Sequence, residues 1–236
     1  MNNVINYFKQ NPRMLTIASM LLSMAVYSFI FGWVVSVGFT LALLVHELGH
    51  YYAAKRVNIS TSVPVFIPFV GALINFKEMP YNAEQEAFIG ISGPIAGTLA
   101  AVVALVGYHF TGYSPLLQIA LLATFLNLFN LIPLSPMDGG RTVTVITPWL
   151  WLVGAVILIG AFIAFKSLII LLIGFVGFKQ IWEVLFNSAY KTGELSAYYK
   201  ASVLTKIKYS FLYLGLILFL GSLLLTCGNL MGGLGN

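Results

Sequence analysis

Residues 14–56 read MLTIASMLLSMAVYSFIFGWVVSVGFTLALLVHELGHYYAAKR and are almost entirely apolar. No Asp, Glu, Lys or Arg occurs among them before Glu47. As a single helix, residues 14–54 would extend roughly 60 Å at about 1.5 Å per residue, which is twice the thickness of the hydrocarbon core of a bilayer. We therefore predict two membrane spans, residues 14–31 and 33–54, with a turn near Gly32.

The composition of the whole chain agrees with a membrane protein. Of its 236 residues, 59% are hydrophobic and 8% are charged, whereas a soluble domain carries about 25% charged residues. The net charge is +5, but the basic residues flank apolar runs and form no basic face, so we expect a lipid bilayer and no nucleic acid as partner. The one cysteine, Cys227, excludes an intramolecular disulfide and a cysteine-based zinc site.

The remaining apolar runs predict five further spans, at about 86–108, 115–133, 148–165, 167–186 and 209–227. The fold class is therefore an all-α polytopic membrane protein with about seven (six to seven) transmembrane helices, and we expect one membrane-embedded domain over residues 1–236. Asn82 has the features of a helix N-cap, with Gln85 three residues later. Pro133 and Pro136 end the fourth helix, a turn carries the Asp-Gly that follows, and a glycine-rich tail comes after the last span.

Residues 63–76, VPVFIPFVGALINF, interrupt the helical pattern. They are rich in β-branched and aromatic residues and contain two prolines and a glycine, which favours short strands, with a hairpin around Gly71. Such a segment could offer a strand edge for main-chain pairing with a substrate. The alternative is a re-entrant loop that plugs the site.

The distribution of basic residues predicts the orientation in the membrane. Lys9 and Arg13 place the N-terminus in the cytoplasm, and we interpret the run that follows them as a retained span, because it lacks a convincing signal-peptide cleavage site. With seven spans, Lys166 falls outside, and the other basic positions flanking the spans fall inside. The region of His46 and Asp138 then lies at the cytoplasmic side. Without a transit segment, a prokaryotic plasma membrane is the expected location.

His46-Glu47-Leu48-Gly49-His50 is the sharpest chemical feature. On a helix, the imidazoles of residues four apart project from one face and can hold one zinc ion. Glu47 is adjacent to the first ligand, where its carboxylate can act as a general base for a water activated by the metal. The alternative is a polar cluster that only ties helices together, although such clusters generally use Ser, Thr or Asn.

A catalytic zinc requires a third protein ligand. Asp138, the only aspartate of the chain, sits where a proline-broken helix meets Gly139-Gly140, and its spacing leaves ligation and a turn-forming Asp-Gly as equal alternatives. Glu86, near the start of the third span, is a second candidate, although a helix-start charge is its simpler role. His109 is assigned to the opposite side of the membrane.

Two segments of the chain resemble the site-2 protease family of intramembrane metalloproteases. His46–His50 is similar to that family's zinc-binding helix. Asn130, Pro133, Asp138 and Gly139 are similar to its Asn-x-x-Pro-x-x-x-x-Asp-Gly motif. Ser92-Gly93-Pro94-Ile95-Ala96-Gly97 also resembles a family feature. The resemblance covers residues 33–145, the expected catalytic core, with C-terminal helices over 148–227. It implies Asp138 as the third ligand of one Zn²⁺ ion.

The resemblance implies an HExxH-type zinc metalloendopeptidase that hydrolyses transmembrane or membrane-proximal segments near the cytoplasmic face. We expect a minimal member without a PDZ or nucleotide-sensing module. Asn130, and Asn127 one turn earlier, are candidates for hydrogen bonding to the substrate or the developing oxyanion. The partners expected are a membrane-protein or membrane-peptide substrate, while a homo-oligomer and a regulatory partner stay open. The alternative is a catalytically silent membrane scaffold or chaperone, against which the intact Glu47 argues.

Overall fold

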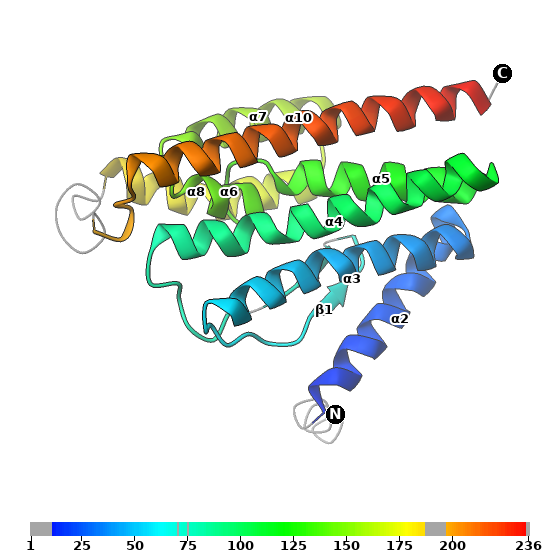
Figure 1. Cartoon of the computed structure of the whole chain (residues 1–236), viewed down its shortest axis with the longest axis horizontal. Helices are drawn as coiled ribbons and strands as arrows, with labels where there is room; N and C mark the ends of the chain where they lie inside the picture. The colour runs from blue at the N-terminus through cyan, green and yellow to red at the C-terminus, as the bar shows by residue number, and fades with distance from the viewer. Residues whose placement is uncertain (1–10, 70, 75, 187–196, 235–236) are drawn as a thin grey trace. The chain divides into compact units, whose positions relative to one another are not determined.

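The structure is a computed structural model that describes residues 11–69, 71–74, 76–186 and 197–234. The described part is mostly helical, with one small antiparallel sheet (Figure 1). In chain order, the elements are α2 (Pro12–Phe31), α3 (Trp33–Arg56), β1 (Val65–Ile67), β2 (Gly71–Leu73), α4 (Ala83–Thr111), α5 (Ser114–Asn130), α6 (Asp138–Val143), α7 (Leu150–Phe165), α8 (Leu168–Phe186) and α10 (Val203–Leu234).

Each predicted span coincides with a helix of the structure. Among the described residues, four helices are long and apolar enough to cross a membrane: α2, α3, α4 and α10. Helices α5 and α7 and the stretch Leu168–Lys179 of α8 are also apolar but shorter. The positions of the helices are therefore confirmed, and the count of seven spans stays a prediction.

The chain divides into two compact units, of which the first comprises Met1–Met79, Ala96–Phe125 and Leu223–Asn236. Helices α2 and α3 pack against each other as a helical hairpin (Figure 1). Gly32 joins them with φ of 77°, a conformation that glycine adopts without steric cost. Edge-to-face packing of Tyr27 on Phe39, with ring centroids 5.5 Å apart, ties the two helices together.

Strands β1 and β2 form the predicted hairpin. Strand β1 pairs antiparallel with β2 so that Phe66 lies opposite Ala72. Side chains of α2 bind β1 and the residues on either side of it at three points. The Thr16 hydroxyl donates to the Pro64 carbonyl at 2.7 Å, the Phe66 N–H donates to Ser19 Oγ at 3.1 Å, and the Phe69 N–H donates to the Tyr27 hydroxyl at 3.1 Å.

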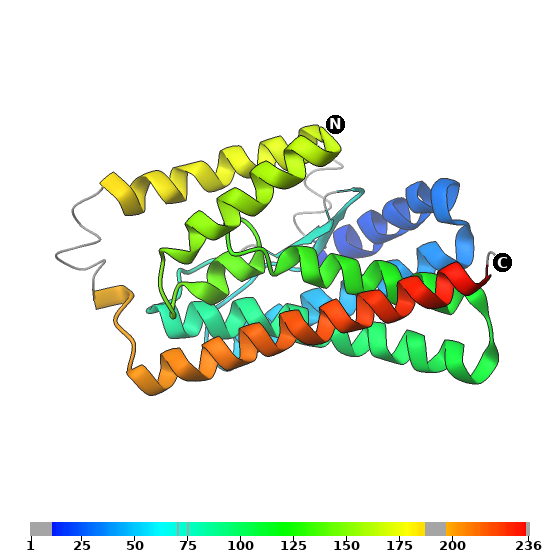
Figure 2. The ribbon, with the colours of Figure 1, turned by 90° about the horizontal axis from the view of Figure 1, so that it is seen from above.

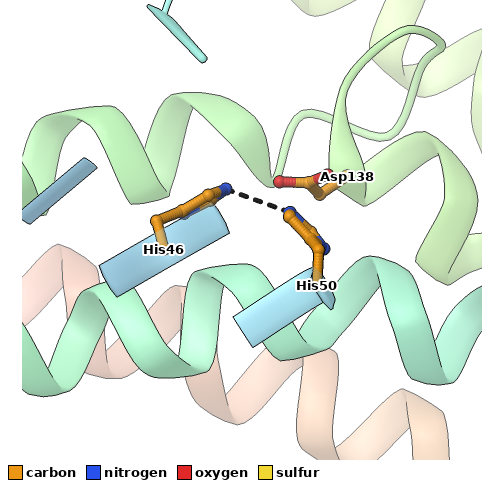
Figure 3. Close-up of side chains that lie close together, drawn as sticks. All are labelled: His46, His50 and Asp138. Carbon is orange, nitrogen blue, oxygen red and sulfur yellow. Dashed lines mark hydrogen bonds between the residues drawn. The ribbon is translucent and has the colours of Figure 1, made fainter. Parts of the chain in front are cut away.

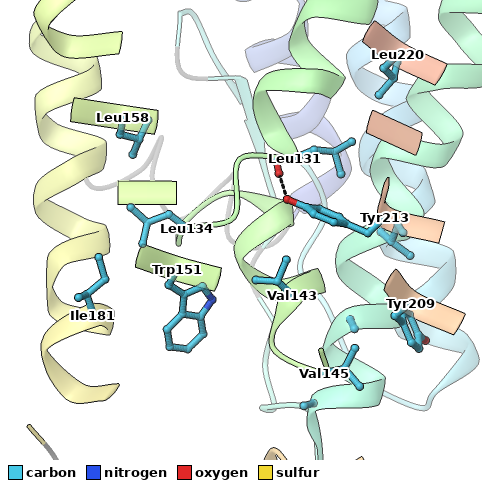
Figure 4. Close-up of a cluster of buried hydrophobic side chains, with 13 residues drawn as sticks. Leu131, Leu134, Val143, Val145, Trp151, Leu158, Ile181, Tyr209, Tyr213 and Leu220 are labelled. Atoms are coloured by element: carbon cyan, nitrogen blue, oxygen red, sulfur yellow. Dashed lines mark hydrogen bonds between the residues drawn. The ribbon is translucent and has the colours of Figure 1, made fainter. Parts of the chain in front are cut away.

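The second unit comprises Pro80–Ile95 and Leu126–Ser222. Its first helix, α4, begins as predicted, because Asn82 Oδ1 accepts from the Gln85 N–H at 2.9 Å. Helices α7 and α8 pack side by side and antiparallel (Figure 2). Leu158 of α7 and Ile181 of α8 belong to a buried cluster that also contains Leu134 and Trp151 (Figure 4).

Four glycines of this unit surround the segment 131–135, which follows α5. A methyl group added to Gly139 would overlap the Leu131 carbonyl. One added to Gly140 would overlap the backbone of Leu134. One added to Gly154 of α7 would overlap the Pro133 carbonyl, and one added to Gly177 of α8 would overlap the Leu134 side chain. The backbone after α5 is therefore packed at a distance that a larger residue does not permit.

Two details of the prediction were wrong. Asp138-Gly139-Gly140-Arg141 is the first turn of α6 and not an isolated turn, because Gly139 and Gly140 let the short helix pack directly on the backbone of 131–135. The glycine-rich tail is helical as far as Leu234. In lipid, a backbone that leaves the helix loses hydrogen bonds that water cannot replace. Of the polar stretch 187–208, residues 187–196 lie outside the described residues.

Candidate metal centre

His46 and His50 lie one helical turn apart on α3. Their Nε2 atoms are 3.1 Å apart, and their ring centroids are 4.9 Å apart. Both side chains are buried, with 2% and 6% of their surface exposed. A buried pair of imidazoles needs a shared proton or a cation between its facing nitrogens, since two lone pairs at this distance repel each other.

Asp138 is the first residue of α6, six residues long. Its carbonyl accepts a hydrogen bond of 2.8 Å from the Thr142 hydroxyl. Helix α4 approaches this turn closely at Gly90, where a Cβ atom would lie 3.0 Å from the Asp138 carbonyl oxygen and 2.9 Å from Arg141 Cβ. Backbone packing within the second unit thus fixes the start of α6.

The structure brings the three predicted ligands together. The ligand atoms of His46, His50 and Asp138 all lie within 4.8 Å of one another. Figure 3 shows the two imidazoles with their facing nitrogens joined by a dashed line and the Asp138 carboxylate beside them. This is the candidate metal site that the described residues form.

The donor set fits zinc. Zinc prefers imidazole nitrogen and carboxylate oxygen at about 2.0–2.2 Å, which places two ligand atoms of a tetrahedral site roughly 3.3 Å from each other. The 3.1 Å between the two Nε2 atoms is close to that separation. Three protein ligands leave one position of a tetrahedral ion for a water or a substrate, which is the arrangement of catalytic zinc sites.

The other predicted site residues lie on the elements expected for them. Glu47 is buried on α3, with 6% of its surface exposed, between the two histidines in sequence. Asn127 is buried within α5 and Asn130 is the last residue of that helix. The roles of these three residues stay predictions.

Glu86, the second candidate ligand, and His109, which the predicted topology excluded, make other contacts. Glu86 lies in the first turn of α4, where its Oε2 accepts a hydrogen bond of 2.8 Å from the Tyr198 hydroxyl. His109 lies in the last turn of α4, where its ring packs edge-on against Phe110. Within the described part of the chain, neither residue belongs to the group that could hold a metal.

Sequence reasoning missed the aromatic residues that hydrogen-bond to α6 and to the segment before it. The Trp151 indole N–H donates to the Gly140 carbonyl at 2.9 Å. The Tyr213 hydroxyl donates to the Leu131 carbonyl, as the dashed line in Figure 4 shows. Both residues stand in apolar runs, where an aromatic side chain is ordinarily interpreted as lipid-facing or as core, so the sequence carried no signal for either contact.

A comparison with protein-family models matches residues 34–117 to Peptidase family M50. The matched segment contains His46, Glu47 and His50 and ends before Asp138. It covers the β-hairpin, the whole of α4, and α3 from its second residue onward.

Curated relatives carry zinc metalloprotease names. "Zinc metalloprotease MJ0392" of Methanocaldococcus jannaschii is 36% identical over 105 residues, covering 42% of this chain and 30% of the relative. "Probable zinc metalloprotease EGY1, chloroplastic" of Arabidopsis thaliana is 37% identical over 65 residues, covering 25% and 12%. A Mycobacterium tuberculosis relative whose name also contains "zinc metalloprotease" is 35% identical over 109 residues, covering 43% and 28%.

The matched region therefore spans less than a third of each of these relatives. The names imply Zn²⁺, the ion that the donor set of His46, His50 and Asp138 fits. The comparisons thus confirm the resemblance to the site-2 proteases of Peptidase family M50, over the segment that carries the paired histidines.

Proposed function

We propose that this chain is an intramembrane zinc endoprotease that hydrolyses peptide bonds of transmembrane or membrane-proximal segments near the cytoplasmic face. The observation that carries the proposal is the convergence of His46, His50 and Asp138 within 4.8 Å. The zinc metalloprotease names of the relatives and the membrane-length apolar helices support it.

In this proposal, His46, His50 and Asp138 hold one zinc ion and Glu47 is the general base. When bound, zinc acts as a Lewis acid toward the scissile carbonyl and lowers the pKa of a water ligand to about 7. The Glu47 carboxylate takes a proton as the water oxygen bonds to the carbonyl carbon, and it returns that proton to the nitrogen as the C–N bond breaks. Burial of Glu47 keeps bulk water away from this transfer.

We further propose that Asn130 donates its side-chain amide to a carbonyl of the substrate. Asn130 ends α5 just before the segment that leads to Asp138. An oriented amide near the reacting bond stabilises negative charge that develops on oxygen. Asn127 is one turn earlier and more deeply buried, so we assign it the supporting position and Asn130 the contact with substrate.

The β-hairpin is our candidate for substrate pairing. Because the Phe66 N–H turns away from β2 to reach Ser19, the pair Phe66–Ala72 is of the non-hydrogen-bonded type, and the Ala72 N–H also points away from β1. Helix α2 occupies the edge of β1, so an unwound substrate strand would add to the edge of β2. Strand β2 packs against α3, the helix that carries His46 and His50.

The test is co-expression with a panel of single-span membrane proteins, in parallel with Glu47→Gln, with zinc content measured on both purified forms. Gln has nearly the shape of Glu but cannot accept a proton, so we expect cleavage to fall by about 10²–10⁴-fold while zinc is retained. Zinc binding without cleavage by the native chain would favour the scaffold alternative. Absence of zinc from the native chain would contradict the metal site.

A further inference from the structure

Helix α6 is too short to fix the position of Asp138 by itself. It has six residues, and its N-cap, Met137, makes no side-chain capping hydrogen bond. A helix of fewer than about 12 residues has little stability of its own in isolation. The orientation of Asp138 must therefore come from contacts between α6 and the elements around it.

The carbonyl groups at the end of α6 are satisfied by specific donors. The last four carbonyls of a helix lack partners within the helix. The Arg141 carbonyl accepts from the Thr144 hydroxyl at 2.6 Å, and the Val143 carbonyl accepts from the N–H groups of Ile146 and Thr147 at 3.0 and 2.9 Å. These donors all follow α6 directly in the chain. The Gly140 carbonyl accepts from Trp151, which belongs to α7.

Trp151 is itself buried and packed against an aromatic neighbour. It is 1% exposed, and its ring meets Tyr199 edge-on with centroids 6.3 Å apart. Tyr199 packs against Tyr198, and the Tyr198 hydroxyl donates to Glu86 at 2.8 Å. The indole therefore has one orientation, in which its N–H meets a carbonyl two residues after Asp138.

Gly140 has no freedom to shift away from this bond. Its Cα is packed against the backbone of Leu134 and Ser135, and Gly139 is packed against Leu131. On the other side, α4 meets α6 at Gly90. Packing restricts translation of α6, whereas the indole hydrogen bond is directional and restricts its rotation about the helix axis. Rotation is the movement that would turn the Asp138 carboxylate.

Building on the zinc site proposed above, we propose that Trp151 is a positioning residue for Asp138. Its indole N–H holds the Gly140 carbonyl and so sets the rotation of α6 at which the Asp138 carboxylate ligates the metal. Partners that orient a metal ligand without touching the metal contribute about 10–100-fold to metal affinity. Trp151 would thus act on metal affinity from within the second unit.

The experiment measures the Kd for Zn²⁺ of the purified full chain by competition with a chelator, for the native protein and for Trp151→Phe. Phe keeps an aromatic ring but donates no hydrogen bond, so we expect the Kd to rise by about 10-fold or more. Trp149→Phe is the matched control. Trp149 is two residues away and 54% exposed, so this variant should keep the native Kd.

Two further measurements separate positioning from stability. Replacing Trp151 by 3-benzothienylalanine keeps the shape of the indole and removes only the donor, so it applies even where Phe disturbs folding. Co²⁺ in place of zinc gives visible absorption bands that depend on ligand geometry. We expect altered bands at saturating Co²⁺ in both position-151 variants and native bands in Trp149→Phe. A purely structural role would leave the bands of the loaded protein unchanged.

A native Kd and native Co²⁺ bands in both position-151 variants would overturn the positioning role. If the native chain binds zinc in that case, the proposed function still stands. If the native chain binds neither Zn²⁺ nor Co²⁺, the proposed function fails and the role of Trp151 fails with it.

Discussion

At the scale of single residues, the candidate site combines a pair of candidate ligands fixed by helix geometry with a third candidate ligand fixed by packing. His46 and His50 follow from their spacing, since residues four apart on a helix face the same side. The structure agrees, since their Nε2 atoms lie 3.1 Å apart on that side of α3. Asp138 is different, because nothing in its local sequence separates a ligand from an ordinary Asp-Gly turn. Only the resemblance, and then the structure, placed it beside the histidines.

The role of Asp138 can be tested by changing it alone. Asp138→Ala removes one of three proposed ligands, and we expect it to lose stoichiometric zinc and all cleavage, because two imidazoles alone hold zinc weakly. Zinc content by elemental analysis of the purified protein is the measurement. Glu84→Gln is the control, since the Glu84 side chain is exposed in the first turn of α4 and lies outside the metal group. Zinc lost in the control but kept in Asp138→Ala would reverse the assignment.

Tyr213 offers a second residue-scale prediction. Tyr213→Phe removes a hydroxyl that donates to the buried Leu131 carbonyl. We expect the free energy of unfolding to fall by about 1–3 kcal/mol, the usual cost of an unsatisfied buried polar group. Titration with a denaturing detergent measures it. Tyr209→Phe is the comparison and should cost less, because the Tyr209 hydroxyl lies 3.4 Å from its acceptor, the Glu84 carbonyl.

At the scale of elements, the sequence predicted positions well and short or irregular pieces less well. Helices α2 to α5, α7 and α8 follow from hydropathy and from the breaks at Gly32, Pro133 and Lys166. Helix α6 was missed because Asp-Gly-Gly has poor helix propensity, which tertiary packing overrides. The close packing around residues 131–135 was also out of reach, since it depends on Gly154 and Gly177, which lie far along the chain.

Two glycines of α7 provide a matched pair for testing that packing. Gly154→Ala places a methyl group against the Pro133 carbonyl, whereas Gly160→Ala meets nothing within 4 Å. We expect Gly154→Ala to lower the free energy of unfolding by about 1–3 kcal/mol, as overpacking does. Gly160→Ala should be neutral or stabilising by up to about 1 kcal/mol. Equal effects of the two changes on detergent-induced unfolding would contradict the described packing.

The hairpin gives a prediction about substrate. Ala72→Pro removes the N–H that points away from β1, at an edge position where proline is tolerated. We expect weaker substrate binding, seen as a raised KM with zinc content unchanged. Proline residues placed in the substrate next to the cleaved bond should also reduce strand pairing. Cleavage that is indifferent to both changes would favour a hairpin that plugs the site.

At the scale of the whole molecule, the apolar composition leaves one main question, which is how many of the helices cross the membrane. Among the described helices, α2, α3, α4 and α10 have the length and hydropathy of spans, while α5, α7 and α8 are shorter. Hydropathy located all of these helices, but it cannot say whether a short apolar helix crosses the bilayer, because tilt, local thinning and neighbouring helices also decide that.

A single cysteine at position 166 tests the predicted seven-span topology. Lys166 lies between α7 and α8, and in the seven-span scheme it faces the outside. In a Cys227→Ser background, we expect Lys166→Cys to react with a membrane-impermeant maleimide added to intact cells. Thr147→Cys, which precedes α7, should react only after the membrane is opened. Labelling of position 166 only in opened membranes would show that the predicted seven-span topology is wrong.

The contact between α2 and β1 limits the number of strands that can add to the small sheet. A free two-stranded hairpin has two open edges and can polymerise by adding strands at both. Thr16, Ser19 and Tyr27 occupy the edge of β1, so in the proposed substrate pairing the sheet would accept one strand, at β2, and then terminate. A peptide and the hairpin of a second copy would compete for that one edge. At high protein density in the membrane, the second copy would therefore be a competitive inhibitor of peptide binding.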